Sequence, residues 1–102
     1  MPFIIETFDK PGHQAVRQAH RPAHLDFLDT HKHLLLACGA KLADDGSDLG
    51  GGLYVVELDT REAAQSFIES DPFFAAGLFE RVSITRWRKA YVAGASHLPA
   101  AA

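Results

Sequence analysis

The sequence predicts an α+β domain whose elements follow the order β-α-β-β-α-β. Short runs of β-branched, aromatic and aliphatic residues end at turn residues, and two longer stretches carry apolar side chains at helical spacing. The chain has 102 residues, 47% of them hydrophobic and 23% charged, which suits one globular domain. This order is that of ferredoxin-like folds, in which a four-stranded antiparallel sheet carries both helices on one face.

The first half of the chain supplies a strand, a helix and a second strand. Residues 3–9 are predicted to form the first strand, which stops at the turn sequence of residues 10–12. A helix is expected over residues 14–32, with apolar positions at Val16, Ala19, Ala23, Phe27 and Leu28. Pro22 lies inside it and has no N–H to donate, so it should kink the helix or start a second segment. Residues 33–42 are the second strand.

The second half repeats the pattern. Residues 53–58 are expected to form the third strand and to make a hairpin with the second, after a turn that ends in three glycines. Asp59 or Thr60 can cap a second helix, which should end at Asp71 because the residue before a proline avoids helical geometry. A short helical turn over residues 73–78 precedes the last strand.

We expect the last strand to span residues 80–91. The segment that follows is rich in alanine and has little to bury, so we assign residues 1–92 to one domain and residues 93–102 to a mobile C-terminal tail.

Composition and charge exclude several classes of function. The formal net charge of −3 disfavours nucleic acid as a partner, because phosphate binding needs a surplus of clustered Lys and Arg. No apolar run approaches the ~20 residues that cross a bilayer, so no membrane partner is expected. The N-terminus does not read as a signal peptide, and the single cysteine, Cys38, cannot form an internal disulfide, which together favour a cytoplasmic location. Cys38 lies mid-strand and is expected to be buried and inert.

The second and third strands are apolar on both sides, although the helices can cover only one face of the sheet. In residues 34–38 and 53–56, side chains point alternately to the two faces of the sheet, and those on both faces are apolar. A bare apolar sheet face would exceed the few hundred Å² usual for a monomer. We therefore expect a homodimer that packs through this sheet face.

A histidine and a distant carboxylate suggest the chemistry. His24 lies near the apolar face of the first helix, and Asp71 ends the second helix, where the fold could bring it to the imidazole. Asp71 would then fix the tautomer of His24, whose other nitrogen could move a proton on a substrate. Arg21, three residues before His24, could bind a carboxylate or enolate oxygen. The alternatives are structural: Asp71 as a turn or cap residue, His24 as a satisfied core residue and Arg21 as a solvated surface residue.

Other polar residues allow weaker readings. Glu6 and Trp87 share the second sheet face with apolar neighbours and could line a cavity between the sheet and its partner; salt bridges at the sheet rim are the alternative for Glu6 and for Glu57. His20 and His24 are spaced like a two-histidine clamp, with His31 further on. No third ligand is evident, so no metal is expected.

Several short motifs, taken together, resemble the YciI-like (YCII-related) family. They lie in family order over about residues 3–91: Asp9-Lys10-Pro11-Gly12, Arg21-Pro22-Ala23-His24-Leu25, Asp44-Asp45-Gly46, Asp71-Pro72-Phe73, Gly77-Leu78-Phe79 and Trp87-Arg88. The resemblance implies the dimeric α+β barrel fold and a site made of His24 and Asp71. Some relatives dehalogenate chloromuconolactone, and the wider superfamily includes isomerases, cofactor-free monooxygenases and haem-handling proteins.

The resemblance and the residues together favour one function over two others. The expected function is cofactor-free acid–base chemistry, of lyase, isomerase or dehalogenase type, on a small anionic organic molecule. Arg21, Glu6 and Trp87 are the candidate substrate-binding residues. The alternative is a non-catalytic small-molecule binding or accessory protein on the same fold, and a weaker one is haem binding through a histidine.

Overall fold

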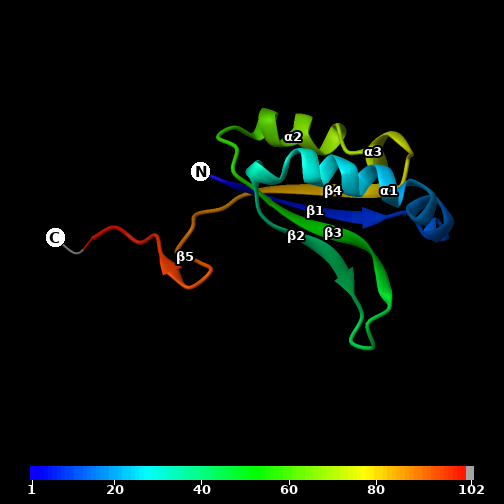
Figure 1. The fold of residues 1–102 in the computed structure, drawn as a ribbon, viewed down its shortest axis with the longest axis horizontal. Helices are drawn as coiled ribbons and strands as arrows, with labels where there is room; N and C mark the ends of the chain where they lie inside the picture. The colour runs from blue at the N-terminus through cyan, green and yellow to red at the C-terminus, as the bar shows by residue number, and fades with distance from the viewer. Residues whose placement is uncertain (101–102) are drawn as a thin grey trace.

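The computed structural model describes residues 1–100 and confirms the α+β class, with a four-stranded antiparallel sheet. Its elements are β1 (Phe3–Asp9), α1 (Gln14–Thr30), η1 (Lys32–Leu34), β2 (Leu35–Leu42), β3 (Asp48–Val56), α2 (Arg61–Glu69), α3 (Pro72–Ala75), β4 (Phe79–Arg86), β5 (Tyr91–Val92) and β6 (Ala95–Ser96). The strand order is β2-β3-β1-β4, and the helices all lie on one face of the sheet (Figure 1).

Element boundaries differ from the sequence predictions most at β2, β3 and β4. β2 begins at Leu35, not at residue 33, because residues 32–34 form the short helix η1. β3 begins at Asp48, not at residue 53, because Gly51 and Gly52 already pair with Phe8 and Thr7 of β1. β4 ends at Arg86, which pairs with Phe3, the first residue of its antiparallel partner β1. Pro22 starts no second segment, since α1 runs through it as one helix.

The last part of the chain extends away from the body of the protein (Figure 1). It contains the short β5–β6 hairpin, in which Tyr91 lies opposite Ser96. The mobility expected of residues 93–102 stays a prediction, and residues 101–102 of that tail lie outside the described part of the chain.

The hydrophobic core lies between the sheet and α2. Phe3 and Ile5 of β1 pack with Tyr54 and Val56 of β3, and α2 covers them with Ala64, Phe67 and Ile68. Thr60, one of the two predicted caps, begins α2 by accepting a hydrogen bond from the backbone N–H of Ala63 at 3.1 Å. By contrast, no residue of α1 is buried. The gap that this leaves between α1 and strands β2 and β3 becomes the cavity described below.

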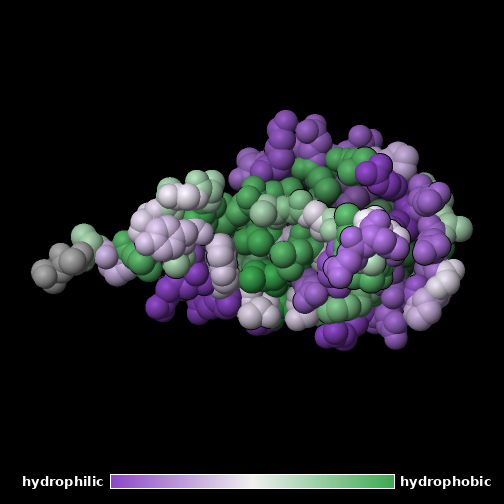
Figure 2. Space-filling view, turned by 90° about the horizontal axis from the view of Figure 1, so that it is seen from below, coloured by the Kyte–Doolittle hydropathy of each residue, from purple (hydrophilic) through white to green (hydrophobic). Residues whose placement is uncertain are grey.

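The other sheet face has no helix over it. Ile4, Glu6 and Phe8 of β1 share this face with Leu53 and Val55 of β3, as their pairing shows. Seen from this side, apolar side chains gather over the sheet and polar ones surround them (Figure 2). Within residues 1–100, no helix is long and apolar enough to cross a membrane.

Gly51 permits close packing of β3 on β1. Its φ is +146°, and a Cβ built there would lie 2.1 Å from the carbonyl oxygen of Thr7. Only glycine fits this position, because both the backbone angle and the contact exclude a side chain. The neighbouring N–H of Gly52 donates to the Thr7 hydroxyl at 2.9 Å. The glycines therefore bring bare backbone to the sheet surface beneath α1.

Candidate functional site

The structure brings His24 and Asp71 together although they are 47 residues apart. Nδ1 of His24 lies 2.8 Å from Oδ2 and 3.0 Å from Oδ1 of Asp71. Asp71 is fully buried, and the His24 side chain is 12% exposed. Nε2 of His24 has no hydrogen-bond partner within residues 1–100. Every buried side-chain nitrogen or oxygen in that part of the chain does have a partner, so Nε2 is not buried and is open to solvent. The pair thus has one buried end and one accessible end.

Asp71 owes its position to local chain geometry. It is the N-cap of α3, where Pro72 occupies the first turn, and its Oδ1 accepts the backbone N–H of Phe73 at 2.9 Å. Its Oδ2 accepts the hydroxyl of Tyr54 at 2.8 Å. The cap role expected as a structural alternative is therefore present, and the same carboxylate also contacts His24.

Two aromatic residues hold the imidazole. The ring of Phe73 stacks on that of His24, with centroids 4.1 Å apart and planes at 17°. The ring of Tyr54 meets it edge-on at 6.3 Å. Burial, followed by the charge of Asp71, raises the pKa of Tyr54 far above its usual value. Tyr54 therefore stays protonated at physiological pH and remains a donor.

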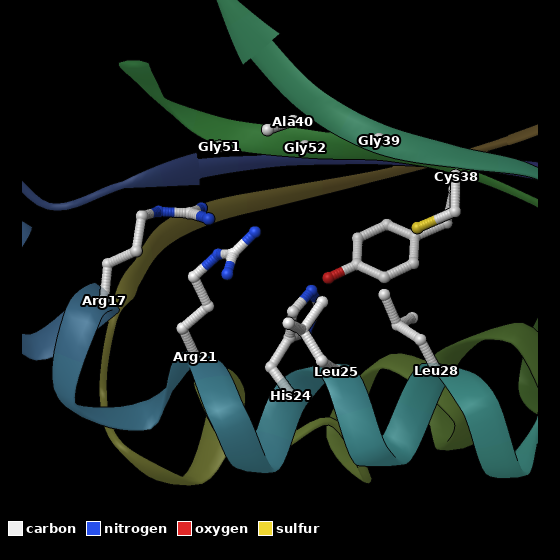
Figure 3. Close-up of a pocket in the computed structure, with 11 residues that line it drawn as sticks. Arg17, Arg21, His24, Leu25, Leu28, Cys38, Gly39, Ala40, Gly51 and Gly52 are labelled. Atoms are coloured by element: carbon white, nitrogen blue, oxygen red, sulfur yellow. The ribbon is translucent and has the colours of Figure 1, made fainter.

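A cavity of about 230 Å³ lies between α1 and the sheet, beside this pair. Its α1 wall is a stripe of side chains at helical spacing that point toward the strands (Figure 3): Arg17, Arg21, His24, Leu25 and Leu28. The facing strands contribute small residues and Tyr54: Cys38, Gly39 and Ala40 of β2, and Gly51, Gly52 and Tyr54 of β3. The cavity is thus apolar at one end and cationic at the other.

The two arginines in the wall differ in their partners. Arg17 binds both oxygens of Asp9, at 2.6 and 3.0 Å, and lies 3.9 Å from Asp48. Burial alone would lower the pKa of Arg17, but the hydrogen bond and charge of Asp9 outweigh it and raise that pKa. Arg21 pairs with no carboxylate within residues 1–100 and lies exposed at the cavity. Arg21 is therefore the cation left for a ligand.

Cys38 is exposed, which corrects the expectation that it is buried. The reason is that β2 is an edge strand over which α1 does not close. Desolvation by its neighbours, followed by the charge of Asp71, raises the pKa of Cys38 to about 11. It lines the cavity as a neutral thiol at physiological pH.

Glu6 and Trp87 do not line this cavity. Glu6 faces the opposite side of the sheet, where its Oε2 lies 3.3 Å from Nζ of Lys41. Glu57 likewise pairs with Lys89. Trp87 follows β4, and its backbone N–H donates to the carbonyl of Pro2. Their predicted role in binding substrate therefore concerns the free sheet face, and it stays a prediction.

The histidines do not form a cluster in the structure. Within residues 1–100, no group of three His, Cys, Asp or Glu side chains is arranged to hold a metal ion. His20 is exposed on α1, and the cavity wall includes His24 without it.

Sequence reasoning missed Arg17 and Tyr54. The signal for Arg17 was available, because residues 17, 21, 24 and 28 recur at intervals of four, three and four and must share a helix face. Tyr54 gave no such signal. It alternates with other apolar residues in β3, and only the sheet register shows that it faces α1.

Comparisons with known proteins agree with this architecture. A family model described as the YCII-related domain matches residues 1–88. Protein YciI of Escherichia coli is 34% identical over 98 residues, covering 89% of this chain and all of the relative. The uncharacterised protein YjpA of Bacillus subtilis is 35% identical over 71 residues, 70% of this chain and 79% of that one.

A solved relative carries an assigned activity. The structure of 5-chloro-2-hydroxyhydroquinone dehydrochlorinase (TftG) of Burkholderia phenoliruptrix, in complex with 2,5-dihydroxybenzoquinone, matches with a TM-score of 0.79. It is 34% identical, and the match covers 86% of this chain and 94% of that one. Together the family match and these identities show that the chain belongs to the YciI-like family of YCII-related domain proteins.

Proposed function

We propose that this protein is a cofactor-independent acid–base enzyme that moves a proton on a small anionic organic molecule. The observation that carries the proposal is the contact of 2.8 Å between His24 Nδ1 and Asp71 Oδ2 at the edge of a cavity, with Nε2 left open. Asp71 orients the ring and stabilises the imidazolium that forms, and Nε2 exchanges the proton with the substrate. Arg21 binds an oxyanion of the substrate.

A dehydrochlorination is the reaction type with the strongest support. The solved relative at 34% identity is a dehydrochlorinase, and its substrate is a small ring with several hydroxyl groups. In such a reaction a hydroxyl proton first moves to the ring carbon that carries chlorine, forming a C–H bond and a C=O bond. Nε2 of His24 then accepts a second hydroxyl proton; the electrons of that O–H bond form the second C=O bond, and chloride leaves with the electrons of the broken C–Cl bond. The reaction needs a group that moves protons and a contact for the oxyanion. The side chains of His24 and Arg21 supply both from the same face of α1.

Chloride release from 5-chloro-2-hydroxyhydroquinone tests this proposal. We expect turnover by the wild type, and a loss of about 10²-fold or more in kcat for His24→Ala and for Asp71→Asn, the range that general acid–base groups contribute. His20→Ala is the matched control, since His20 lies one turn earlier on α1 and is exposed. Circular dichroism must show each variant to be folded.

Two results would count against the proposal. A folded His24→Ala protein with full activity would exclude His24 as the catalytic base. If the wild type binds 2,5-dihydroxybenzoquinone by calorimetry but turns over no chlorinated or isomerisable ring acid, the non-catalytic binding function takes its place.

We also propose a homodimer that packs through the free sheet face. Leu53 on this face is 40% exposed, and within residues 1–100 no helix lies over it or its neighbour Ile4 from that side. Glu6 and Trp87 would border the gap between the two sheets. Light scattering at low micromolar concentration should give twice the mass of 11.1 kDa. Leu53→Glu should give the monomer, and Leu98→Glu in the tail should not; a wild-type monomer would contradict the proposal.

A further inference from the structure

Asp71 is clamped through each of its oxygens separately. Oδ1 accepts the backbone N–H of Phe73 at 2.9 Å, and Oδ2 accepts the hydroxyl of Tyr54 at 2.8 Å. The backbone of α3 thus fixes one oxygen and a side chain of β3 fixes the other. The carboxylate cannot rotate while both bonds hold, and it presents the edge between its oxygens to Nδ1 of His24.

The clamp also sets which atoms donate and which accept. An ionised carboxylate can only accept hydrogen bonds, so Tyr54 and Nδ1 of His24 must each point a proton at Asp71. A neutral imidazole has one N–H, and with the proton on Nδ1 the lone pair lies on Nε2. The acceptor that a general base needs is therefore at the open end of the pair.

Tyr54 is suited to this part because it cannot easily give up its proton. Its side chain is 2% exposed, and Asp71 is its hydrogen-bond partner at a buried position. A tyrosinate there would face the carboxylate with no proton between them. Its hydroxyl already donates to Asp71, so any ligand that reached the same oxygen would have to donate to it.

We infer that Tyr54 is a positioning residue: its hydroxyl holds the Oδ2 oxygen of Asp71, and through Asp71 it keeps the proton of His24 on Nδ1 and the lone pair on Nε2. Its effect on rate rests on the proposed function, but its effect on the tautomer does not. Tyr54 also lines the cavity, but its hydroxyl is engaged with Asp71 and acts through that carboxylate. Its removal should therefore alter the orientation and tautomer of His24 and leave the cavity in place.

Tyr54→Phe tests the inference, because it removes the hydroxyl and keeps the ring. Tyr91→Phe is the matched control, since Tyr91 is the only other tyrosine and lies exposed on the β5–β6 hairpin. Nitrogen-15 NMR of the free protein reports the tautomer of His24, with His24→Ala to assign its signals. Steady-state kinetics on 5-chloro-2-hydroxyhydroquinone then separates kcat from KM.

In the wild type and in Tyr91→Phe we expect a single Nδ1–H tautomer with a slowly exchanging proton. In Tyr54→Phe we expect faster exchange of that proton and a second population with the proton on Nε2. We also expect kcat to fall by about 10- to 100-fold and KM to change by less than about 3-fold, as for other residues that orient an active group. Replacement of the tyrosines by 3-fluorotyrosine, a stronger donor, should shift the Nδ1 resonance in the opposite direction. This second measurement applies if Tyr54→Phe does not fold.

If the His24 spectrum of Tyr54→Phe is unchanged, the inference is overturned whatever the rates. If that variant does not fold, an unchanged His24 spectrum in the fluorotyrosine protein overturns it instead. A changed tautomer supports it even where no tested compound is turned over; that outcome would count against the proposed reaction instead.

Discussion

Asp71 accepts hydrogen bonds from three separate groups at a buried position, so its replacement by alanine should lower the free energy of unfolding. Asp71→Ala removes the acceptor for Tyr54, for the N–H of Phe73 and for His24 at a fully buried position. It also removes the N-cap of α3. We therefore expect a large loss in the free energy of unfolding, although only four heavy-atom contacts disappear.

The size of the loss follows from the burial of each donor. The Tyr54 hydroxyl is buried and would lose its partner, at about 1–3 kcal/mol. The cap at Phe73 adds about 0.5–2 kcal/mol. His24 is partly exposed and can turn to water, so its share is smaller. The total of about 2–6 kcal/mol is a large part of the 5–15 kcal/mol typical of small domains and corresponds to a fall in melting temperature of roughly 8 °C or more.

Urea unfolding measures this loss, followed by the fluorescence of Trp87, the only tryptophan. Asp29→Ala is the control, because Asp29 is 78% exposed in a surface ion pair with Lys32 and should change stability by less than about 0.5 kcal/mol. A loss below about 1 kcal/mol for Asp71→Ala, with an unchanged slope against urea, would refute the picture of Asp71 as the shared acceptor of three donors.

Three further outcomes follow from the geometry around the cavity. Gly51→Ala should destabilise the protein by about 2–4 kcal/mol in urea, because its Cβ would strike the Thr7 carbonyl and its φ is unfavourable; a neutral effect would show that β3 can shift. Cys38, with a pKa of about 11, should react with iodoacetamide at pH 8 about 10²-fold more slowly than in the unfolded chain. Because folding raises that pKa, the contribution of Cys38 to the free energy of unfolding is fully present below about pH 9 and is lost as the pH rises to about 11. Equal alkylation rates in the folded and unfolded chains would contradict both statements. The raised pKa of Tyr54 predicts equal tyrosinate absorbance at 295 nm for wild type and Tyr54→Phe up to pH 11, and an excess in the wild type would refute it.

The fold could be predicted from the sequence because hydrophobic periodicity fixes which elements exist. The β-branched and aromatic run at residues 3–9 forms β1, and the helix predicted between the Asp59 or Thr60 cap and Asp71 forms α2. Boundaries were less predictable, because they depend on partners. β4 ends opposite Phe3, where β1 begins, and the glycines before residue 53 join β3 because β1 lies beside them.

The site was predictable in part, and the limit has a physical cause. His24 and Asp71 could be singled out because His24 is a polar residue near the apolar face of the first helix, and Asp71 precedes the proline that ends the second helix. Tyr54 could not, because a buried tyrosine in a strand reads as core until the sheet register and the hydrogen bond to Asp71 are known. Strand alternation assigned Glu6 and Trp87 to the sheet face away from the helices, and the register places Glu6 on that face, across the sheet from the cavity.

The net charge of the sequence does not reveal which charged side chains at the cavity lack partners, but the structure does and so indicates the kind of ligand. The chain as a whole is acidic, with a formal charge of −3, and that figure gives no indication that it binds anions. Within the cavity, however, the charges pair off: Arg17 is neutralised by Asp9, and Asp71 is held by its three donors. Arg21 is left without a carboxylate in the described chain, beside the open nitrogen of His24. Arg21 therefore offers a positive charge without a carboxylate partner on an acidic protein, and a small anion that can lose a proton satisfies Arg21 and Nε2 of His24 at once.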